Sequence, residues 1–396
     1  MTTYQTSAAK HGISSEGNKV ASNAYSRPAD ETFDTIDDLI NFKKADASLM
    51  TSRVIDTHKI DIVGTIDEDN PSMGDVFVQY DCPKTGDVIE AAPTNWSFGQ
   101  LSQLAGAPAG YLKDLPAPLA ADNLMWGLKH NRGRETIKTY GNSQSYGGEL
   151  RAATGADYGR IYDHEILAPV KILCDEYGYK TPGSITGFGG DMSTYDPEAI
   201  TSSTIWGSDR DIFVFQVDDR NPISIGKLPD GSDDLMFRGF YVWNSEVGSK
   251  TAGLAAFYLR GVCMNRNLWG VENFQEIKVR HSKYAPDRFA NEIRPALRSF
   301  ATGGTGNLLA GVQAAQSAKI ARDDDDRLDF LTKRAGLSGR MAKAAMARHI
   351  VEEGKPVSSV WDAAQAITAI ARDIPHQDQR VMIERKAGAL LDKVAA

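Results

Sequence analysis

The sequence predicts an α+β fold, in which an antiparallel sheet forms the core and a helical region follows at the C-terminus. Two observations lead to this prediction. Between about residues 50 and 284, short alternating or aromatic-rich runs that are typical of strands are interrupted by a few helical stretches. From about residue 285 onward, Ala, Arg, Leu and Lys dominate and strand formers become rare, which is typical of helices.

The chain of 396 residues is divided into three parts by composition. Residues 1–32 are rich in Ser, Thr, Ala, Asn and Gly and have little to bury, so they are predicted to be a disordered tail. Residues 33–284 hold the strand-like text and are predicted to be the α+β core domain. Residues 285–396 are predicted to be the helical C-terminal region.

In the first half of the core, apolar residues are spaced alternately as in helices and as in strands. Apolar residues at helical spacing predict a short helix over 33–42. Alternation over 53–66 and 75–93 predicts strands, and "PKTGD" within the second run predicts a hairpin turn. Residues 98–130 change to a helical period that is broken at "GAP", which predicts three short helices. Strands are expected again over 134–152.

The second half of the core is richer in aromatic residues. A helix of about 15 residues is expected within 158–178, and "DRDIFVFQVDD" (209–219) is expected to be a buried strand. The run "MFRGFYVW" (236–243) predicts another strand. "LAAFYLRGVCM" (254–264) also fits a helix face, but Gly261 and the aromatic and β-branched content favour a strand.

Charge and cysteine content indicate a cytoplasmic protein. The net charge is -8, and residues 1–93 account for it with eight Lys/Arg against sixteen Asp/Glu, so the remainder is free to carry basic patches. No apolar run approaches the roughly 18 residues that span a bilayer, and the N-terminus has no secretory apolar region. Cys82, Cys174 and Cys263 form no paired motif, which favours a reducing compartment.

Several motifs together resemble a known family. The run "NSEVGSKTAGLAAFYLRGVCMNRNLWG" (244–270) is similar to the signature of the phage/plasmid-like proteins of unknown function, family 932 of the domains of unknown function. "LAGAPAGYLKDLP", "LRAATGADYGRIYDHEIL", "IKVRHS" and "QRVMIERKAGALL" resemble other family segments in the same order. Arg266 stands where the family has glycine, and the Ser usual before Tyr158 is missing. The resemblance implies a phage, prophage or plasmid setting near DNA metabolism, and it implies no established activity.

The most polar motifs of the core suggest a binding site or a catalytic site. The residues in these motifs whose side chains could bind a ligand or take part in catalysis are Tyr158, Arg160, Asp163, His164, Asn244, Ser245, Glu246, Arg260, Asn265, Arg280 and His281. For catalysis, His164, Glu246 and His281 are the candidates for acid–base work. For nucleic-acid binding, the arginines would contact phosphates while Tyr158 and Trp243 stack on bases. The structural alternative is that Asn244 and Ser245 close a turn, Asp163 caps a helix and Arg260 pairs with a buried carboxylate.

A basic segment follows the last predicted strand. Residues 278–298 hold six Lys/Arg against one Asp and one Glu, with aromatic residues interleaved. Basic residues with interleaved aromatics suit a surface that follows a nucleic-acid backbone and stacks on its bases. The contacts predicted here are Lys278, Arg280, Lys283 and Arg288. A solvated helix face is the structural alternative.

Other motifs give no site. The glycine-rich runs at 187–191 and 301–307 lack the Gly-Lys-Ser/Thr of a phosphate loop, so they are expected to be plain loops. The seven histidines are dispersed and "RDDDDR" lacks calcium-loop spacing, so we expect no metal site and no cofactor. Residues 327–350 resemble a helix-turn-helix superficially, but an αα-hairpin is the simpler interpretation. Cys263 is expected to be a buried thiol.

Taken together, the sequence predicts a phage- or plasmid-borne cytoplasmic protein of a bacterial host. We expect it to act in DNA metabolism by binding or annealing nucleic acid, single strands in particular, without catalysis. A phosphate-handling enzyme such as a nuclease, centred on Asp163, His164, Glu246 and His281, is an alternative. A second alternative is an inhibitor of a host defence protein that is contacted through the acidic N-terminal third. We also expect that the protein can form a homo-oligomer and that it does not bind a membrane.

Overall fold

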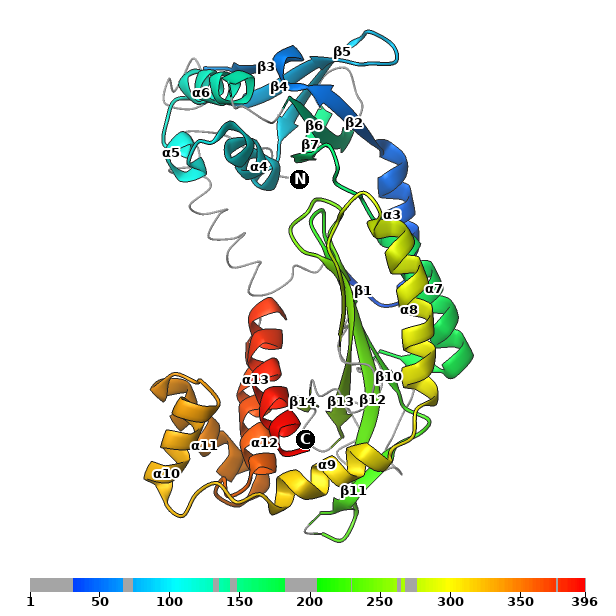
Figure 1. The fold of residues 1–396 in the computed structure, drawn as a ribbon, viewed down its shortest axis with the longest axis vertical. Coiled ribbons are helices and arrows are strands. Elements are labelled where there is room, and N and C mark those ends of the chain that lie inside the picture. The colour runs from blue at the N-terminus through cyan, green and yellow to red at the C-terminus, as the bar shows by residue number, and fades with distance from the viewer. Residues whose placement is uncertain are drawn as a thin grey trace.

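A computed structural model describes residues 31–66, 74–130, 135–142, 148–181, 205–228, 230–261, 265–267, 276–374 and 377–395. These residues form two lobes stacked along the long axis of the molecule (Figure 1). Each lobe is built on its own sheet, and helices follow at the C-terminus, so the predicted α+β class is confirmed. No helix within these ranges is both long and apolar enough to cross a membrane.

The N-terminal lobe is a six-stranded sheet covered by three helices. Its strand order is β2-β6-β7-β5-β4-β3, and every neighbouring pair is antiparallel except β5 with β7. The strands are β2 (Met50–Asp56), β3 (Ile60–Gly64), β4 (Val76–Asp81), β5 (Val88–Pro93), β6 (Thr136–Asn142) and β7 (Gly148–Gly155). The turn Thr57–Lys59 joins β2 to β3, and the predicted hairpin joins β4 to β5.

The three helices of this lobe match the predicted change of period. They are α4 (Asn95–Ala105), α5 (Ala109–Lys113) and α6 (Ala117–His130). Helix α4 begins where the Thr94 side chain accepts a hydrogen bond from the Ser97 amide, and it ends at Gly106, whose φ of 73° is accessible to glycine at little cost. The apolar side chains of α4 and α6, including Phe98 and Leu124, pack on the sheet to form the lobe's core.

The C-terminal lobe contains a nine-stranded antiparallel sheet. Its main order is β1-β9-β10-β12-β13-β14, while β8 pairs with β10, β11 with β12 and β15 with β13. The strands are β1 (Thr32–Phe33), β8 (Tyr179–Lys180), β9 (Ile205–Gly207), β10 (Ile212–Asp218), β11 (Ile223–Lys227), β12 (Asp233–Asn244), β13 (Ala252–Arg260), β14 (Asn265–Asn267) and β15 (Glu276–Val279). Residues 254–260 of the segment 254–264 are therefore part of a strand, as predicted, and Gly261 lies in the turn that follows.

Strand β12 is buried on both faces because different elements cover them. Phe240 and Val242 point into a core that includes residues of α3 (Ile36–Leu49), α7 (Asp163–Tyr177) and α8 (Ala285–Thr302). Tyr241 and Trp243 alternate with them and point to the opposite face, as the period of two requires. There they join an aromatic cluster that Val381 of α13 (Gln377–Ala395) also contacts.

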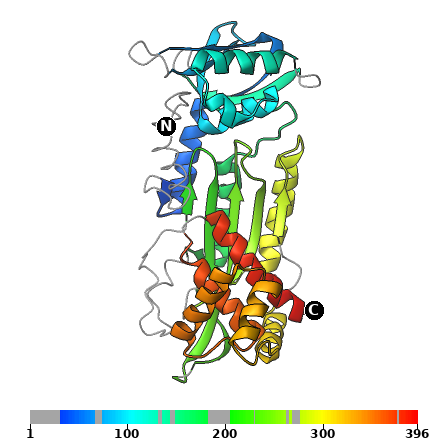
Figure 2. The ribbon, with the colours of Figure 1, turned by 90° about the vertical axis from the view of Figure 1, so that its left-hand side faces the viewer.

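The remaining C-terminal helices pack beside the lower part of the sheet. They are α9 (Gly306–Ser317), α10 (Asp324–Asp329) with a π-helical turn at Phe330–Arg334, α11 (Gly339–Glu353) and α12 (Val360–Ala371). Figure 2 shows α11 to α13 in front of the strands. Residues of α8, α9 and α12 share the main core of the lobe, so the helical region is not a separate body.

The predicted boundaries differ from these lobes in two respects. The predicted core of residues 33–284 contains two separate sheets, because strands β2 to β7 pair only among themselves. Of the predicted tail, residues 1–30 lie outside the described residues, while Thr32 pairs with Trp206 in β1 and β9. The segment 187–191 and Cys263 also lie outside the described part of the chain.

Candidate nucleic-acid interface

A buried polar cluster lies where the two lobes meet. The chain brings together Lys43 of α3, Tyr140 of β6, the segment 158–163 before and at the start of α7, and the segment 244–246 at the end of β12 and just after it. Tyr140 comes from the N-terminal lobe, and the other three belong to the C-terminal lobe. We call this set the junction cluster.

An ion pair stands at the centre of the junction cluster. Lys43 Nζ lies 2.9 Å from Asp163 Oδ2, and both side chains are almost fully buried. Asn244 Nδ2 donates to Asp163 Oδ1 over 2.8 Å and also to the Ile161 carbonyl. Burial lowers the pKa of Lys43, but the charges of Asp163 and Glu246 outweigh it and raise the pKa above its usual value. Lys43 is therefore charged, and it neutralises Asp163.

The carboxylate of Glu246 joins the two lobes. Its Oε2 accepts a hydrogen bond of 2.7 Å from the Tyr140 hydroxyl, and its Oε1 accepts one of 2.8 Å from the Asp163 amide. Burial and, next, the negative charge of Asp163 raise the pKa of Glu246 to about 7. Nearby, Val247 O accepts from Trp96 Nε1 and Gln100 Nε2 of α4, which adds two further contacts between the lobes.

A stack of rings leads from the junction cluster to the surface. The Arg160 guanidinium lies 3.8 Å from the Tyr140 ring centre and 5.5 Å from that of Tyr158, and its Nη1 donates to the Glu246 carbonyl. Tyr158 in turn stacks on His281, with ring centres 4.9 Å apart. Burial lowers the pKa of His281, so its imidazole is neutral at pH 7.

The residues on either side of His281 form an exposed turn. We define the basic turn as Lys278–Tyr284, which joins β15 to α8 at the top of the C-terminal lobe (Figure 1). The imidazole Nδ1 of His281 donates to the Gly159 carbonyl over 3.1 Å. A Cβ at Gly159 would lie 1.9 Å from the Ser282 carbonyl oxygen, so this close approach of the two backbones requires glycine. The turn is thus held firmly against the junction cluster.

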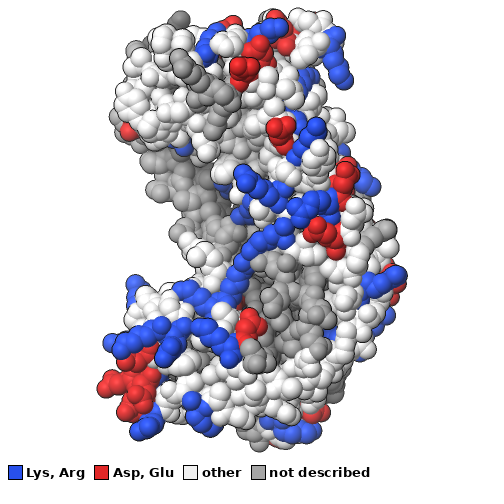
Figure 3. All heavy atoms as spheres, viewed as in Figure 1, with Lys and Arg blue, Asp and Glu red and all other residues white. Residues whose placement is uncertain are grey.

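The basic turn presents cations to solvent. Lys278, Arg280 and Lys283 are exposed, and no ion pair is present for Arg280 or Lys283 within the described residues. Arg288 in the first turns of α8 is also exposed and pairs with Glu292 at 3.1 Å. Figure 3, viewed from the same side as Figure 1, shows Lys and Arg side chains gathered across the middle of the molecule. Exposed cations of this kind are able to contact phosphate groups.

Three residues predicted to contact nucleic acid are instead buried, and the prediction is corrected for them. Arg160 is 7% exposed within the junction cluster. Trp243 lies on the inner aromatic face of the sheet, where its ring stacks on Tyr241 at 5.1 Å and fills the space above Gly253. Arg260 is 3% exposed and fully engaged by carboxylates. Tyr158 is half-buried and supports His281, so it contacts the basic turn from beneath.

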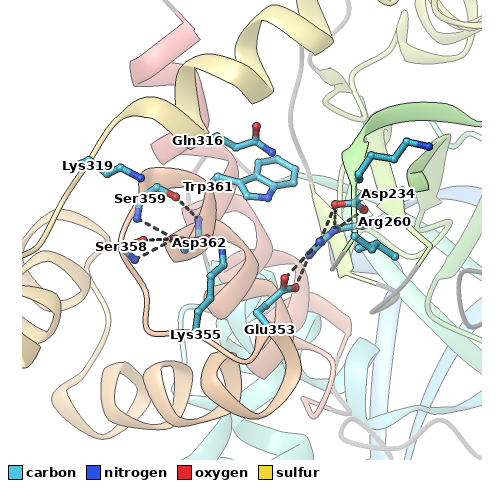
Figure 4. Close-up of a pocket in the computed structure, with 12 residues that line it drawn as sticks. Asp234, Arg260, Gln316, Lys319, Glu353, Lys355, Ser358, Ser359, Trp361 and Asp362 are labelled. Carbon is cyan, nitrogen blue, oxygen red and sulfur yellow. Dashed lines mark hydrogen bonds and ion pairs between the residues drawn. The ribbon is translucent and has the colours of Figure 1, made fainter. Parts of the chain in front are cut away.

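Arg260 belongs to a different part of the molecule. It lines a cavity of about 440 Å³ between the end of the sheet and the C-terminal helices (Figure 4). Its Nε and Nη2 donate to Asp234 of β12 at 2.8 and 2.7 Å, and its Nη1 pairs with Glu353 of α11. The structural alternative for Arg260, a pair with a buried carboxylate, is therefore the correct one. Its role is to connect α11 to the sheet.

The candidates for catalysis lie in the same region but are enclosed. Glu246 and His281 are both buried, and each is held by the hydrogen bonds described above. His164 is half-buried beside Tyr162, with ring centres 5.7 Å apart. Among the described residues, no three His, Cys, Asp or Glu side chains are arranged to hold a metal ion. The side chain of Asn265 lies outside the described part of the chain.

The structural alternatives for the remaining motif residues hold in part. The Ser245 hydroxyl accepts a hydrogen bond of 2.9 Å from the Ser249 amide and so closes the turn after β12, as expected. Asn244 does not close that turn but anchors Asp163. Asp163 is the first residue of α7 and pairs with Lys43, while its predicted capping bond is absent because Tyr162 occupies the cap position.

Sequence reasoning missed Lys43 and Tyr140. Lys43 lies in an ordinary amphipathic helix, and its only signal was a lysine among apolar neighbours. Tyr140 lies in a different lobe from the residues it contacts. Comparison of the chain with models of protein families, with curated proteins and with solved structures finds no significant match.

Proposed function

We propose that this protein binds nucleic acid through the basic turn, with single strands favoured, and that it acts in the DNA metabolism of a phage or plasmid in the cytoplasm of a bacterial host. Annealing of complementary strands is the specific activity that we propose. The observation that carries the proposal is a pair of exposed cations, Arg280 and Lys283, which make no ion pair with any described residue and flank a buried anchor at the junction of the lobes.

Electrostatics permit this function in an acidic protein. The excess negative charge of the sequence falls within residues 1–93, whereas residues 278–298 carry a local excess of positive charge. Charges are screened beyond about 8 Å at physiological salt, so any carboxylate farther than this from the basic turn opposes phosphate binding only weakly. A short basic surface on a rigid support is therefore sufficient for contact with a polynucleotide backbone.

The anchoring of the basic turn favours binding over a merely solvated loop. The buried His281 side chain and the close contact at Gly159 fix the backbone between Arg280 and Lys283. Cations on a fixed backbone lose less conformational freedom when they bind a phosphate, which raises affinity.

A direct test compares Arg280→Ala/Lys283→Ala with Lys59→Ala/Lys84→Ala. The second pair removes the same charge from exposed positions of the N-terminal lobe that have no ion pair among the described residues. Loss of two phosphate contacts lowers single-strand affinity about 25-fold at 0.1 M salt, since each contact contributes about 0.7 to the logarithmic salt slope. The measurement is fluorescence anisotropy of a labelled oligonucleotide. Equal affinities for the two double variants would show that the basic turn is not the binding surface.

A further inference from the structure

We infer that Tyr284 is the residue that selects single strands, because its ring stacks on an unpaired base while Arg280 and Lys283 hold the adjoining phosphates. This inference rests on the proposed function and assigns a specificity-determining residue within it. Tyr284 is the last residue of the basic turn and directly precedes α8.

The ring of Tyr284 is presented to solvent. The residue is 66% exposed, and its only aromatic or cationic ring partner within the described part of the chain is the Lys283 ammonium, 5.9 Å from the ring centre. Trp126 is similarly exposed, but its ring is already stacked on His130 at 3.8 Å. Tyr284 thus has a free aromatic face beside a cation, which is the arrangement that binds bases in single-strand sites.

Tyr284 also occupies a position where tyrosine does not help the helix. Helices α3, α4, α11 and α12 each begin with a Thr or Ser whose side chain accepts a hydrogen bond from the first turn. At the start of α8 the tyrosine makes no such bond, and Tyr162 at the start of α7 makes none either. Serine, threonine, aspartate and asparagine are strongly preferred there. The helix itself therefore does not require tyrosine at this position.

The neighbouring side chains complete the site. Lys283 and Arg280 lie one and four residues before Tyr284, on the same anchored turn. A base that stacks on the ring therefore brings its own phosphates near both cations. In a duplex the faces of the bases are covered by their neighbours, so the ring has no face to contact unless a base is unstacked. Stacking on Tyr284 consequently strengthens single-strand binding and leaves duplex binding unchanged.

The test uses the full chain with Tyr284→Ala, Tyr284→Phe and the control Tyr111→Ala, which removes a tyrosine 58% exposed in the N-terminal lobe. Anisotropy is measured with labelled single- and double-stranded DNA of one sequence over a salt series. We expect Tyr284→Ala to weaken single-strand binding about 5- to 150-fold, with the salt slope and duplex affinity unchanged. Tyr284→Phe and Tyr111→Ala should both bind as the wild type does.

The outcomes separate this inference from the proposed function. If Tyr284→Ala binds single strands as the wild type does while Arg280→Ala/Lys283→Ala does not, the stacking role is wrong and the binding surface stands. An equal loss for single strands and duplex overturns the selectivity role as well. If the wild type binds neither form of DNA, both the proposed function and the role of Tyr284 are refuted.

Discussion

The substitution Lys43→Met tests whether the junction cluster holds the two lobes together. Methionine has nearly the length of lysine but no charge, so the packing of the side chain along α3 is largely kept. The Asp163 carboxylate is then left buried without its cation, and the Ser208 carbonyl loses a hydrogen-bond donor. The remaining side-chain partner of the Asp163 carboxylate is the neutral amide of Asn244.

The size of the effect follows from burial. Lys43 and Asp163 are 3% and 1% exposed, and their charged atoms are 2.9 Å apart. Removing one partner of a buried pair costs about 3–5 kcal/mol, because an uncompensated charge remains. Lys171→Met is the matched control, since Lys171 pairs at the surface with the exposed carboxylates of Asp175 in α7 and Asp37 in α3. An exposed pair of this spacing contributes at most about 0.5 kcal/mol.

The assay is urea unfolding at pH 7, with the free energy obtained from the midpoint and the slope. Lys43→Met should lose several kcal/mol and Lys171→Met almost none. The double variant Lys43→Met/Asp163→Asn should recover most of the loss, because no unpaired charge remains at that position. If Lys43→Met costs no more than Lys171→Met, the ion pair is not an important part of the junction.

Three further predictions concern other parts of the molecule. The pKa of Glu246 is raised from 4.5 to about 7 by burial and by Asp163, so the folded protein binds this proton more tightly than the unfolded chain does. The resulting stability is present below about pH 4.5 and is lost as the pH rises to about 7, by on the order of 3 kcal/mol. Glu246→Gln removes this pH dependence, and urea midpoints that change in parallel for both proteins would contradict the assignment. Arg260→Met should cost about 3–5 kcal/mol in the same assay and leave the salt slope of DNA binding unchanged, whereas a reduced slope would show that Arg260 contacts phosphate. Gly253→Ala places a Cβ 2.1 Å from the Trp243 ring and should lower the free energy of unfolding by about 1–3 kcal/mol. Gly99→Ala in α4 meets open space and should raise it by up to about 1 kcal/mol. Both changes are measured as shifts in melting temperature.

Local sequence patterns predicted most helices and strands, because whether a segment forms a helix or a strand depends largely on its own residues. The helical period in residues 98–130, with its break at Gly106, matches α4 to α6. The aromatic and β-branched runs match β10, β12 and β13. The division into two sheets was not predictable in this way, because strand pairing depends on contacts between distant residues. The parallel contact of β5 with β7, which are separated in the sequence by three helices and β6, is one such pairing.

The candidate site was predicted in part for the same reason. The polar motifs around Arg160, Asn244 and His281 do come together, since each lies at the end of an element that meets the lobe junction. Whether an arginine is exposed cannot be determined from its own neighbours. Arg260 finds its carboxylates 26 and 93 residues away in the sequence, so only the tertiary structure shows that it is buried and paired.

The exposure of Tyr284 likewise could not be predicted from its neighbours in the sequence. The sequence "SKYAPD" marks the start of a helix after a basic run, but it does not show which ring remains outside the core. In the structure, His281 points inward to stack on Tyr158 while Tyr284 points to solvent.

The most direct test of nucleic-acid binding is the salt dependence of the wild-type protein's affinity for a labelled single-stranded oligonucleotide. The basic turn and the start of α8 offer Lys278, Arg280, Lys283 and Arg288, so three to four phosphate contacts are expected. The logarithm of the association constant should then fall linearly with the logarithm of salt, with a slope of about -2 to -3. No binding at about 50 mM salt, or an affinity that does not change with salt, would contradict the proposed function.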